Sequence, residues 1–133
     1  MKTLNTILNG ELSLYLKTWN CHWNVEGPWF ASLHALFGEQ YGALQSLIDE
    51  MAERIRARGA RAETALEARF DGSLDARAML AELAEAHENL SRRIREQAIP
   101  EFEQAGDPGT VDLLTRAMQL HDKAAWMLRA SAR

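Results

Sequence analysis

The residues best suited to chemistry are two histidines and two carboxylates: His22, His34, Asp49 and Glu53. Imidazole nitrogen combined with carboxylate oxygen suits Fe(II), Mn(II) or Zn(II) better than Ca(II) or Mg(II), and oxygen-rich coordination with vacant positions suits redox iron. Because Asp49 and Glu53 are four residues apart, a helix would project both carboxylates from one face, with Cβ atoms roughly 6 Å apart. Taken singly, a helical histidine is more often a hydrogen-bonded or surface residue, and paired carboxylates are more often a solvated face.

A single helix cannot bring His34 and Asp49 to one metal ion. Their separation in sequence leaves them about 60° apart in rotation but about 22 Å apart along the helix axis, whereas metal–ligand distances are about 2 Å. Two chains can meet the requirement, because antiparallel packing of this helix on its copy, with a two-fold axis near Tyr41 and Gly42, brings His34 of one subunit to Asp49 of the other. Small residues such as Gly38 would let the two backbones approach. The alternative is ordinary helix packing with these polar groups outside.

Iron-binding bundles can also hold the metal within each subunit, using Glu-x-x-His pairs on two helices. No such pair occurs in this chain, because the residues three positions before the four histidines are Trp19, Ala31, Ala84 and Met118. The sequence therefore favours a mixed histidine and carboxylate site at a two-fold interface.

Apolar residues recur at three- and four-residue spacing along most of the chain, which predicts an all-α fold. We expect long helices over residues 3–25 and 30–58, a third from residue 74 or 75, and a fourth capped by Thr110 and reaching the C-terminus. Pro100 should kink or interrupt the third helix. A short helix is expected over Ala60–Phe70. The second and third long helices are joined by a long connection, and the other neighbouring helices are joined by short ones. This order predicts a four-helix bundle with a crossover.

Composition narrows the class of protein. The 133 residues, 47% of them hydrophobic, suit one domain with a real core. The formal net charge is -4, which lacks the basic excess of a dedicated nucleic-acid-binding domain. Cys21 is the only cysteine, so an internal disulfide is excluded, and we expect a buried small side chain there. No apolar run is long enough for a membrane helix or a signal peptide, so we expect a cytoplasmic protein.

Three groups of motifs occur at specific spacings along the chain. They are the segment from His22 to Gly27 with Phe30; Leu33-His34 with Phe37, Tyr41, Asp49 and Ala52-Glu53-Arg54; and Gly106-Asp107 with Asp112-Leu113-Leu114-Thr115 and the segment from His121 to Leu128. Together they resemble the Dps mini-ferritins, the DNA-binding proteins from starved cells, over nearly the whole chain. The resemblance implies a ferritin-like bundle, assembled as a hollow homododecamer. It also implies a ferroxidase that oxidises Fe(II) with hydrogen peroxide or oxygen, stores ferric mineral and limits oxidative damage.

The resemblance also implies roles for individual residues. His22 and His34 from one chain, with Asp49 and Glu53 from its partner, would bind iron at each two-fold interface, in agreement with the helix arithmetic. Trp23 resembles a tryptophan near the iron site that could intercept oxidising equivalents; a bundle-core tryptophan is the alternative. Asp112 and Asp122 resemble acids lining iron-entry pores; the alternative is a helix N-terminal acid that complements the dipole.

Gly38 departs from the family pattern, which commonly has Asp or Glu four residues after the second histidine. Glu39 does not replace it, because one residue on a helix is a rotation of about 100°. One alternative function is therefore a structural oligomer whose ferroxidase chemistry is weakened at Gly38. Another is a nucleoid protein, although the chain ends offer few cations for DNA phosphates: Lys2, Arg129 and Arg133.

The remaining histidines and tryptophans are interpreted as structural. His87 and His121 lie on apolar stripes, where we expect bundle histidines whose hydrogen bonds are satisfied. We assign the other tryptophans to packing: Trp19, Trp29 and Trp126.

Overall fold

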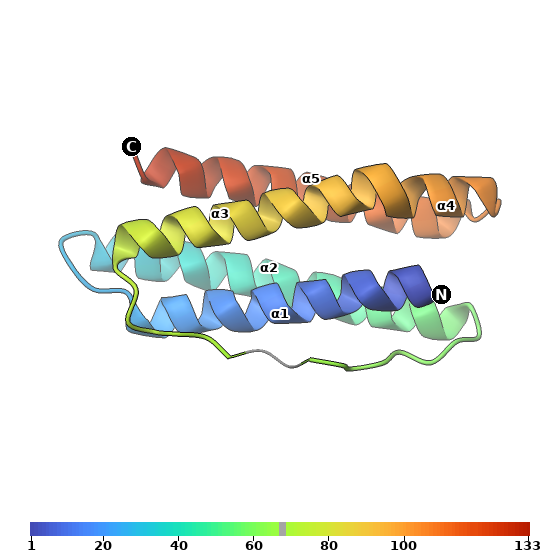
Figure 1. Cartoon of the computed structure of the whole chain (residues 1–133), viewed down its shortest axis with the longest axis horizontal. Helices are drawn as coiled ribbons and strands as arrows, with labels where there is room; N and C mark the ends of the chain where they lie inside the picture. Colours follow the sequence, from blue (N-terminus) through green and yellow to red (C-terminus); the bar gives the residue numbers. More distant parts are fainter. Residues whose placement is uncertain (67–68) are drawn as a thin grey trace.

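The computed structural model describes residues 1–66 and 69–133, and in this part of the chain it is all-α (Figure 1). The elements are α1 (Lys2–Asn24), α2 (Phe30–Ala57), α3 (Ala76–Arg93), the π-helical segment η1 (Ile94–Ala98), α4 (Ile99–Gln104) and α5 (Pro108–Ser131). The first two helices form one hairpin, and the interrupted rod from α3 to α4 forms a second hairpin with α5. The predicted four-helix bundle is confirmed.

The core lies between the two hairpins in two apolar groups. One surrounds Leu4, Ile55 and Leu114, and the other surrounds Phe37 and Leu83; all five side chains are fully buried. Regular three- and four-residue spacing brings these residues to one side of each helix, and their burial supplies the main favourable term in folding. None of the described helices is long and apolar enough to cross a membrane.

The third helix is interrupted before Pro100, as expected. A five-residue π-helical segment, Ile94–Ala98, precedes α4, and Pro100 lies in the first turn of α4. Proline has no N–H to donate and its ring displaces the preceding turn, so the chain takes up one wider turn before the helix resumes.

The helix α5 begins with Asp107 as its N-cap, so the prediction that Thr110 caps this helix is wrong. The Asp107 carboxylate accepts a hydrogen bond from the Thr110 backbone N–H at 3.2 Å and another from the Thr110 hydroxyl at 2.6 Å. Pro108 can occupy the first turn because its missing N–H would have no intrahelical partner there. Arg54 and Arg58 of the α2 end also pair with Asp107, at 2.6 and 3.2 Å. One carboxylate thus joins the end of α2 to the start of α5.

Asp107→Ala is expected to lower the free energy of unfolding by about 2–4 kcal/mol, because the helix loses its cap and two arginines lose their counter-charge. Hydrogen bonds from Thr110 and then Arg54 lower the pKa of Asp107 from 3.8 to about 2. The carboxyl is more acidic in the folded state, so its stabilisation is complete above the ordinary pKa and disappears as the pH falls towards 2. Urea unfolding at pH 7 and near pH 2 measures both effects.

The exposed Asp112 provides the control for this experiment. Asp112→Ala should change the free energy of unfolding by no more than about 0.5 kcal/mol. Equal urea midpoints for the two variants at pH 7 would show that Asp107 does not hold α2 and α5 together.

The connection between α2 and α3 corrects the expectation of a short helix over Ala60–Phe70. Residues 60–66 and 69–70 are not helical, and Glu67 and Ala68 lie outside the described residues. Two asparagines of α1 bond this backbone: Asn5 pairs with Arg61 O and Glu63 N at 2.9 and 2.8 Å, and Asn9 pairs with Glu63 O and Ala65 N at 3.0 and 2.8 Å. Backbone groups bonded to these side-chain amides are unavailable for the bonds of a helix.

Candidate metal centre

The five residues between α1 and α2 turn the chain so that His22 and His34 lie side by side. Their rings stack with centroids 3.7 Å apart and planes inclined by 15°. Nδ1 of His22 is 2.7 Å from the carbonyl oxygen of His34, and Nδ1 of His34 is 2.7 Å from the carbonyl oxygen of His22. Because a carbonyl oxygen only accepts, both Nδ1 atoms carry the proton. In the neutral form of each ring, the lone pair therefore lies on Nε2, the atom through which a histidine with a bonded Nδ1 binds a metal ion.

Aromatic side chains hold this histidine pair. Phe30 stacks on His34 with centroids 5.0 Å apart, and the Tyr41 ring lies edge-on to His22 at 5.2 Å. Trp23, the neighbour of His22, is 57% exposed and packs against Trp19 at 4.8 Å. Trp23 is therefore not a bundle-core residue in this subunit, which excludes the alternative of simple core packing.

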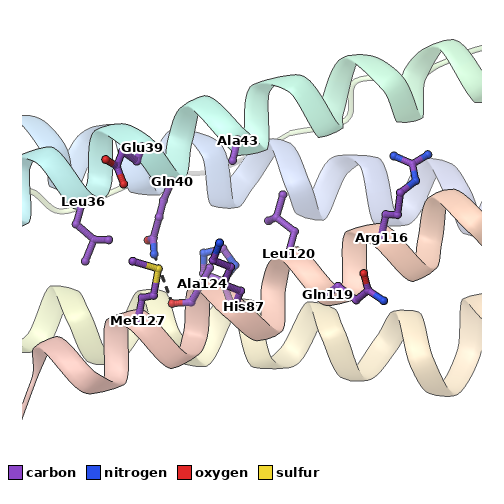
Figure 2. A pocket seen from close by; sticks show the side chains of 11 residues that line it. Leu36, Glu39, Gln40, Ala43, His87, Arg116, Gln119, Leu120, Ala124 and Met127 are labelled. Atoms are coloured by element: carbon purple, nitrogen blue, oxygen red, sulfur yellow. Dashed lines mark hydrogen bonds between the residues drawn. The ribbon is translucent and has the colours of Figure 1, made fainter.

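Gly38 lies directly against His22 of its own chain. A Cβ atom at this position would be 3.2 Å from Cε1 and 3.4 Å from Nδ1 of His22. The small residue thus leaves room for an imidazole ring within the subunit, a reason different from the close approach of two subunits that we expected. Glu39 lies instead beside a cavity between α2 and α5, as the rotation of one helical residue predicts (Figure 2).

Asp49 and Glu53 form the second pair, on an exposed face of α2. A hydrogen bond with Asp49 is the largest cause that raises the pKa of Glu53 above its ordinary value, and repulsion from the Asp49 charge adds to it. Two carboxylates this close hold a proton between them more readily than either does alone. A metal cation can take the place of that proton and relieve the repulsion.

The structure does not bring all four predicted ligands together in one chain. Among the described residues, no three groups drawn from histidine, cysteine, aspartate and glutamate lie close enough to hold a metal ion. The histidine pair is near the start of α2, and the carboxylate pair is in its second half. Beside Asp49, α2 has a shallow hollow of about 440 Å³ lined by Gln45, Ser46, Ile48, Asp49 and Ala52. Each subunit therefore holds the four predicted ligands as two separate pairs, neither of which has the three groups that a metal site needs.

The two acids considered as pore residues have partners within the subunit. Asp112 is exposed on the first turns of α5 and pairs with Arg116 at 3.2 Å. Asp122 accepts a hydrogen bond from the Ser91 hydroxyl. Cys21 is buried, as predicted, and burial raises the pKa of its thiol to about 11.

The interpretation of the remaining aromatic residues and histidines needs correction. Trp29 and Trp126 are 61% and 66% exposed, so they are not packed within the subunit as expected. His87 and His121 are fully buried and bonded to each other, but Nε2 of His87 has no hydrogen-bond partner among the described residues. Helical spacing showed that both histidines face the core. Whether every ring nitrogen is paired depends on neighbours from other helices.

Known proteins share this fold and much of this sequence. A family model for a ferritin-like domain matches residues 1–133. A low temperature-induced protein of Nostoc sp. (strain PCC 7120) is 37% identical over 96% of this chain and 76% of its own length. DNA protection during starvation protein 2 of Bacillus anthracis is 32% identical over 97% of this chain and 96% of its own length.

Solved structures agree with these relatives. Dps from Thermosynechococcus elongatus superposes with a TM-score of 0.90 at 30% identity, covering 98% of this chain and 88% of that one. Dps from Vibrio cholerae O1, described as a ferritin-like diiron-carboxylate protein, gives a TM-score of 0.90 at 31% identity, covering 99% and 87%. The bundle and the family match define the class, a ferritin-like protein. Within that class, the chain belongs to the Dps family of mini-ferritins.

Proposed function

We propose that this protein is a ferroxidase and iron store whose metal sites form between two subunits. His22 and His34 of one subunit bind the metal through Nε2, and Asp49 and Glu53 of the other complete the site. The observation that carries the proposal is the pair of reciprocal histidine bonds, which leaves Nε2 of both rings available for a metal ion. The two carboxylates are exposed on α2, the helix that also carries His34. Antiparallel pairing of α2 with its copy brings the two halves together and makes two equivalent sites per dimer.

The residues present fit ferrous iron as a substrate. The carboxylate pair supplies negative charge, and the imidazoles supply borderline nitrogen ligands. Each hydrogen peroxide molecule accepts two electrons, one from each of two ferrous ions, and with two protons leaves as two molecules of water. Trp23, exposed and packed at a tilt against Trp19, is the residue that would take up an oxidising equivalent escaping from the site.

The same proposal includes assembly into a closed homododecamer in the cytoplasm, with ferric mineral inside. Asp112 and Asp122 would line the routes by which iron enters. Support comes from the Dps family membership and from the half-sites, which require at least a dimer. Sedimentation at micromolar concentration tests the assembly, and a purely monomeric protein would overturn it.

His34→Ala is expected to lower the rate of peroxide-driven Fe(II) oxidation by about 10- to 100-fold, because the site loses one of its two imidazole ligands. Stopped-flow absorbance of the ferric product measures the rate. Glu39→Ala is the matched control, since Glu39 is an exposed carboxylate near the histidines that faces another part of the subunit. The Glu39→Ala variant should oxidise Fe(II) at a rate within about twofold of that of the unsubstituted protein. Equal rates for both variants would show that His34 is not a ligand.

Binding to DNA is the second function to consider, because relatives are named for DNA protection during starvation. The net charge of -4 per chain opposes the approach of phosphates. We therefore expect no retardation of plasmid DNA in a gel at about 150 mM salt, where screening is already strong. The same gel at low salt is the control for weak electrostatic contact. Retardation that persists at the higher salt concentration would contradict the expectation and point to a local basic patch.

A further inference from the structure

A cavity of about 470 Å³ lies between α2 and α5 (Figure 2), and neither the histidine pair nor the carboxylate pair lines it. Its walls are largely apolar, formed by Leu36, Ala43, Leu120 and Met127. A volume of this size, lined by apolar surface together with polar groups that can orient a ligand, is typical of a small-molecule site.

Two buried polar groups at this cavity have an atom without a partner. Gln40 is 8% exposed, and its amide nitrogen donates to the Ala124 carbonyl at 3.4 Å, so the amide assignment leaves Oε1 as the free acceptor. His87 is fully buried. Neither Oε1 of Gln40 nor Nε2 of His87 has a hydrogen-bond partner among the described residues. Buried polar atoms are nearly always paired, so these two indicate a missing ligand or water.

A buried chain of hydrogen bonds determines which protons His87 carries. Nε2 of His121 is 2.6 Å from a carboxylate oxygen of Glu11, and Nδ1 of His121 is 2.8 Å from Nδ1 of His87. We assign both ring nitrogens of His121 as donors, Nε2 to the Glu11 carboxylate and Nδ1 to His87, so His87 accepts at Nδ1.

His87 itself stays neutral. Burial, together with the charge of His121, lowers the pKa of His87 to about 3. A neutral imidazole carries one proton, and because Nδ1 accepts from His121, that proton is on Nε2. The cavity therefore offers one free donor, from His87, and one free acceptor, from Gln40.

The charged residues around the cavity do not require a charged ligand. Arg116 is paired with Glu50 at 2.6 Å and with Asp112 at 3.2 Å. The other two charged groups that line the cavity, Glu39 and Lys123, are of opposite sign. A neutral molecule suits this lining best.

We propose that the cavity binds a small neutral molecule with an apolar body and a hydroxyl head. The hydroxyl oxygen accepts a hydrogen bond from Nε2 of His87, and the hydroxyl proton is donated to Oε1 of Gln40. The apolar body packs against the leucine, alanine and methionine side chains of the walls. This site is separate from the proposed iron site and does not depend on it.

Isothermal titration of the assembled protein with benzyl alcohol and with toluene tests this proposal. The two probes share an aromatic ring and differ in the hydroxyl, so the expected result is at least tenfold tighter binding of benzyl alcohol. A site built to hydrogen-bond a hydroxyl discriminates against a molecule that lacks it, because its own polar groups stay unpaired. Equal affinity for the two probes overturns the proposal. Absence of binding also overturns it and leaves water or another subunit as the occupant.

Substitutions in the lining show which group causes the preference for benzyl alcohol over toluene. Gln40→Leu removes the acceptor and should reduce the preference for benzyl alcohol to less than threefold while toluene still binds, which shows that the cavity persists. Gln119→Leu makes the same change at an exposed residue of the lining and should keep the preference. If Gln40→Leu does not fold, Gln40→Met removes the same oxygen. A preference that survives the loss of Gln40 overturns the proposal.

Discussion

Mixed oligomers of His34→Ala and Asp49→Ala should recover about a quarter of the unsubstituted rate of Fe(II) oxidation, although each variant alone is nearly inactive. If the histidines and carboxylates of each site come from different chains, as proposed, a dimer of the two variants has one site with both lesions and one site with neither. Random pairing of equal amounts makes half of the dimers mixed, so about one site in four is intact. The two variants are unfolded together and refolded, and the rate of peroxide-driven Fe(II) oxidation then gives the fraction of activity that is recovered.

A second mixture provides the control. His22→Ala mixed with His34→Ala places both lesions in the histidine half, so every site lacks a ligand and no activity should return. Mass spectrometry of the intact oligomers confirms that both mixtures contain mixed dimers. If the first mixture recovers no more activity than the second, the ligands come from one chain and the shared site is refuted.

Gly38→Glu is expected to bind ferrous iron at least tenfold more tightly than Gly38→Ala. Both substitutions place a Cβ atom 3.2 Å from Cε1 of His22, so both require that ring to shift by a few tenths of an ångström. The glutamate alone adds an anionic oxygen ligand where the family commonly has an acidic residue, and its negative charge attracts the ferrous ion. The difference between the two variants therefore isolates the carboxylate from the crowding. Titration calorimetry with Fe(II) under anaerobic conditions measures both affinities.

Comparison with the unsubstituted protein shows how much the added Cβ atom by itself changes the affinity for Fe(II). If Gly38→Ala binds iron more weakly than the unsubstituted protein, the shift of His22 is harmful by itself. If Gly38→Glu binds no better than Gly38→Ala in intact oligomers, this position does not face the metal, and the departure at Gly38 does not weaken the site.

The sequence alone was sufficient for the first two long helices and for one feature of the site. Helices α1 and α2 begin and end within one residue of the predicted bounds, because apolar periodicity and the Gly27-Pro28 stop are local signals. The fixed rise of a helix also showed that His34 and Asp49 cannot meet within one chain, and the structure indeed leaves them in separate groups. These inferences needed only the distance between residues along the chain.

Contacts between distant segments could be learned only from the tertiary structure. The chain from 60 to 66 is extended because Asn5 and Asn9, more than fifty positions away, bond its backbone. The space occupied by the His22 ring explains Gly38. The partner of His87 Nδ1 is His121 from another helix, and His121 is in turn bonded to Glu11 from a third. Periodicity shows which face of a helix is buried. It does not show which polar atom meets which, because that depends on how the helices pack against one another.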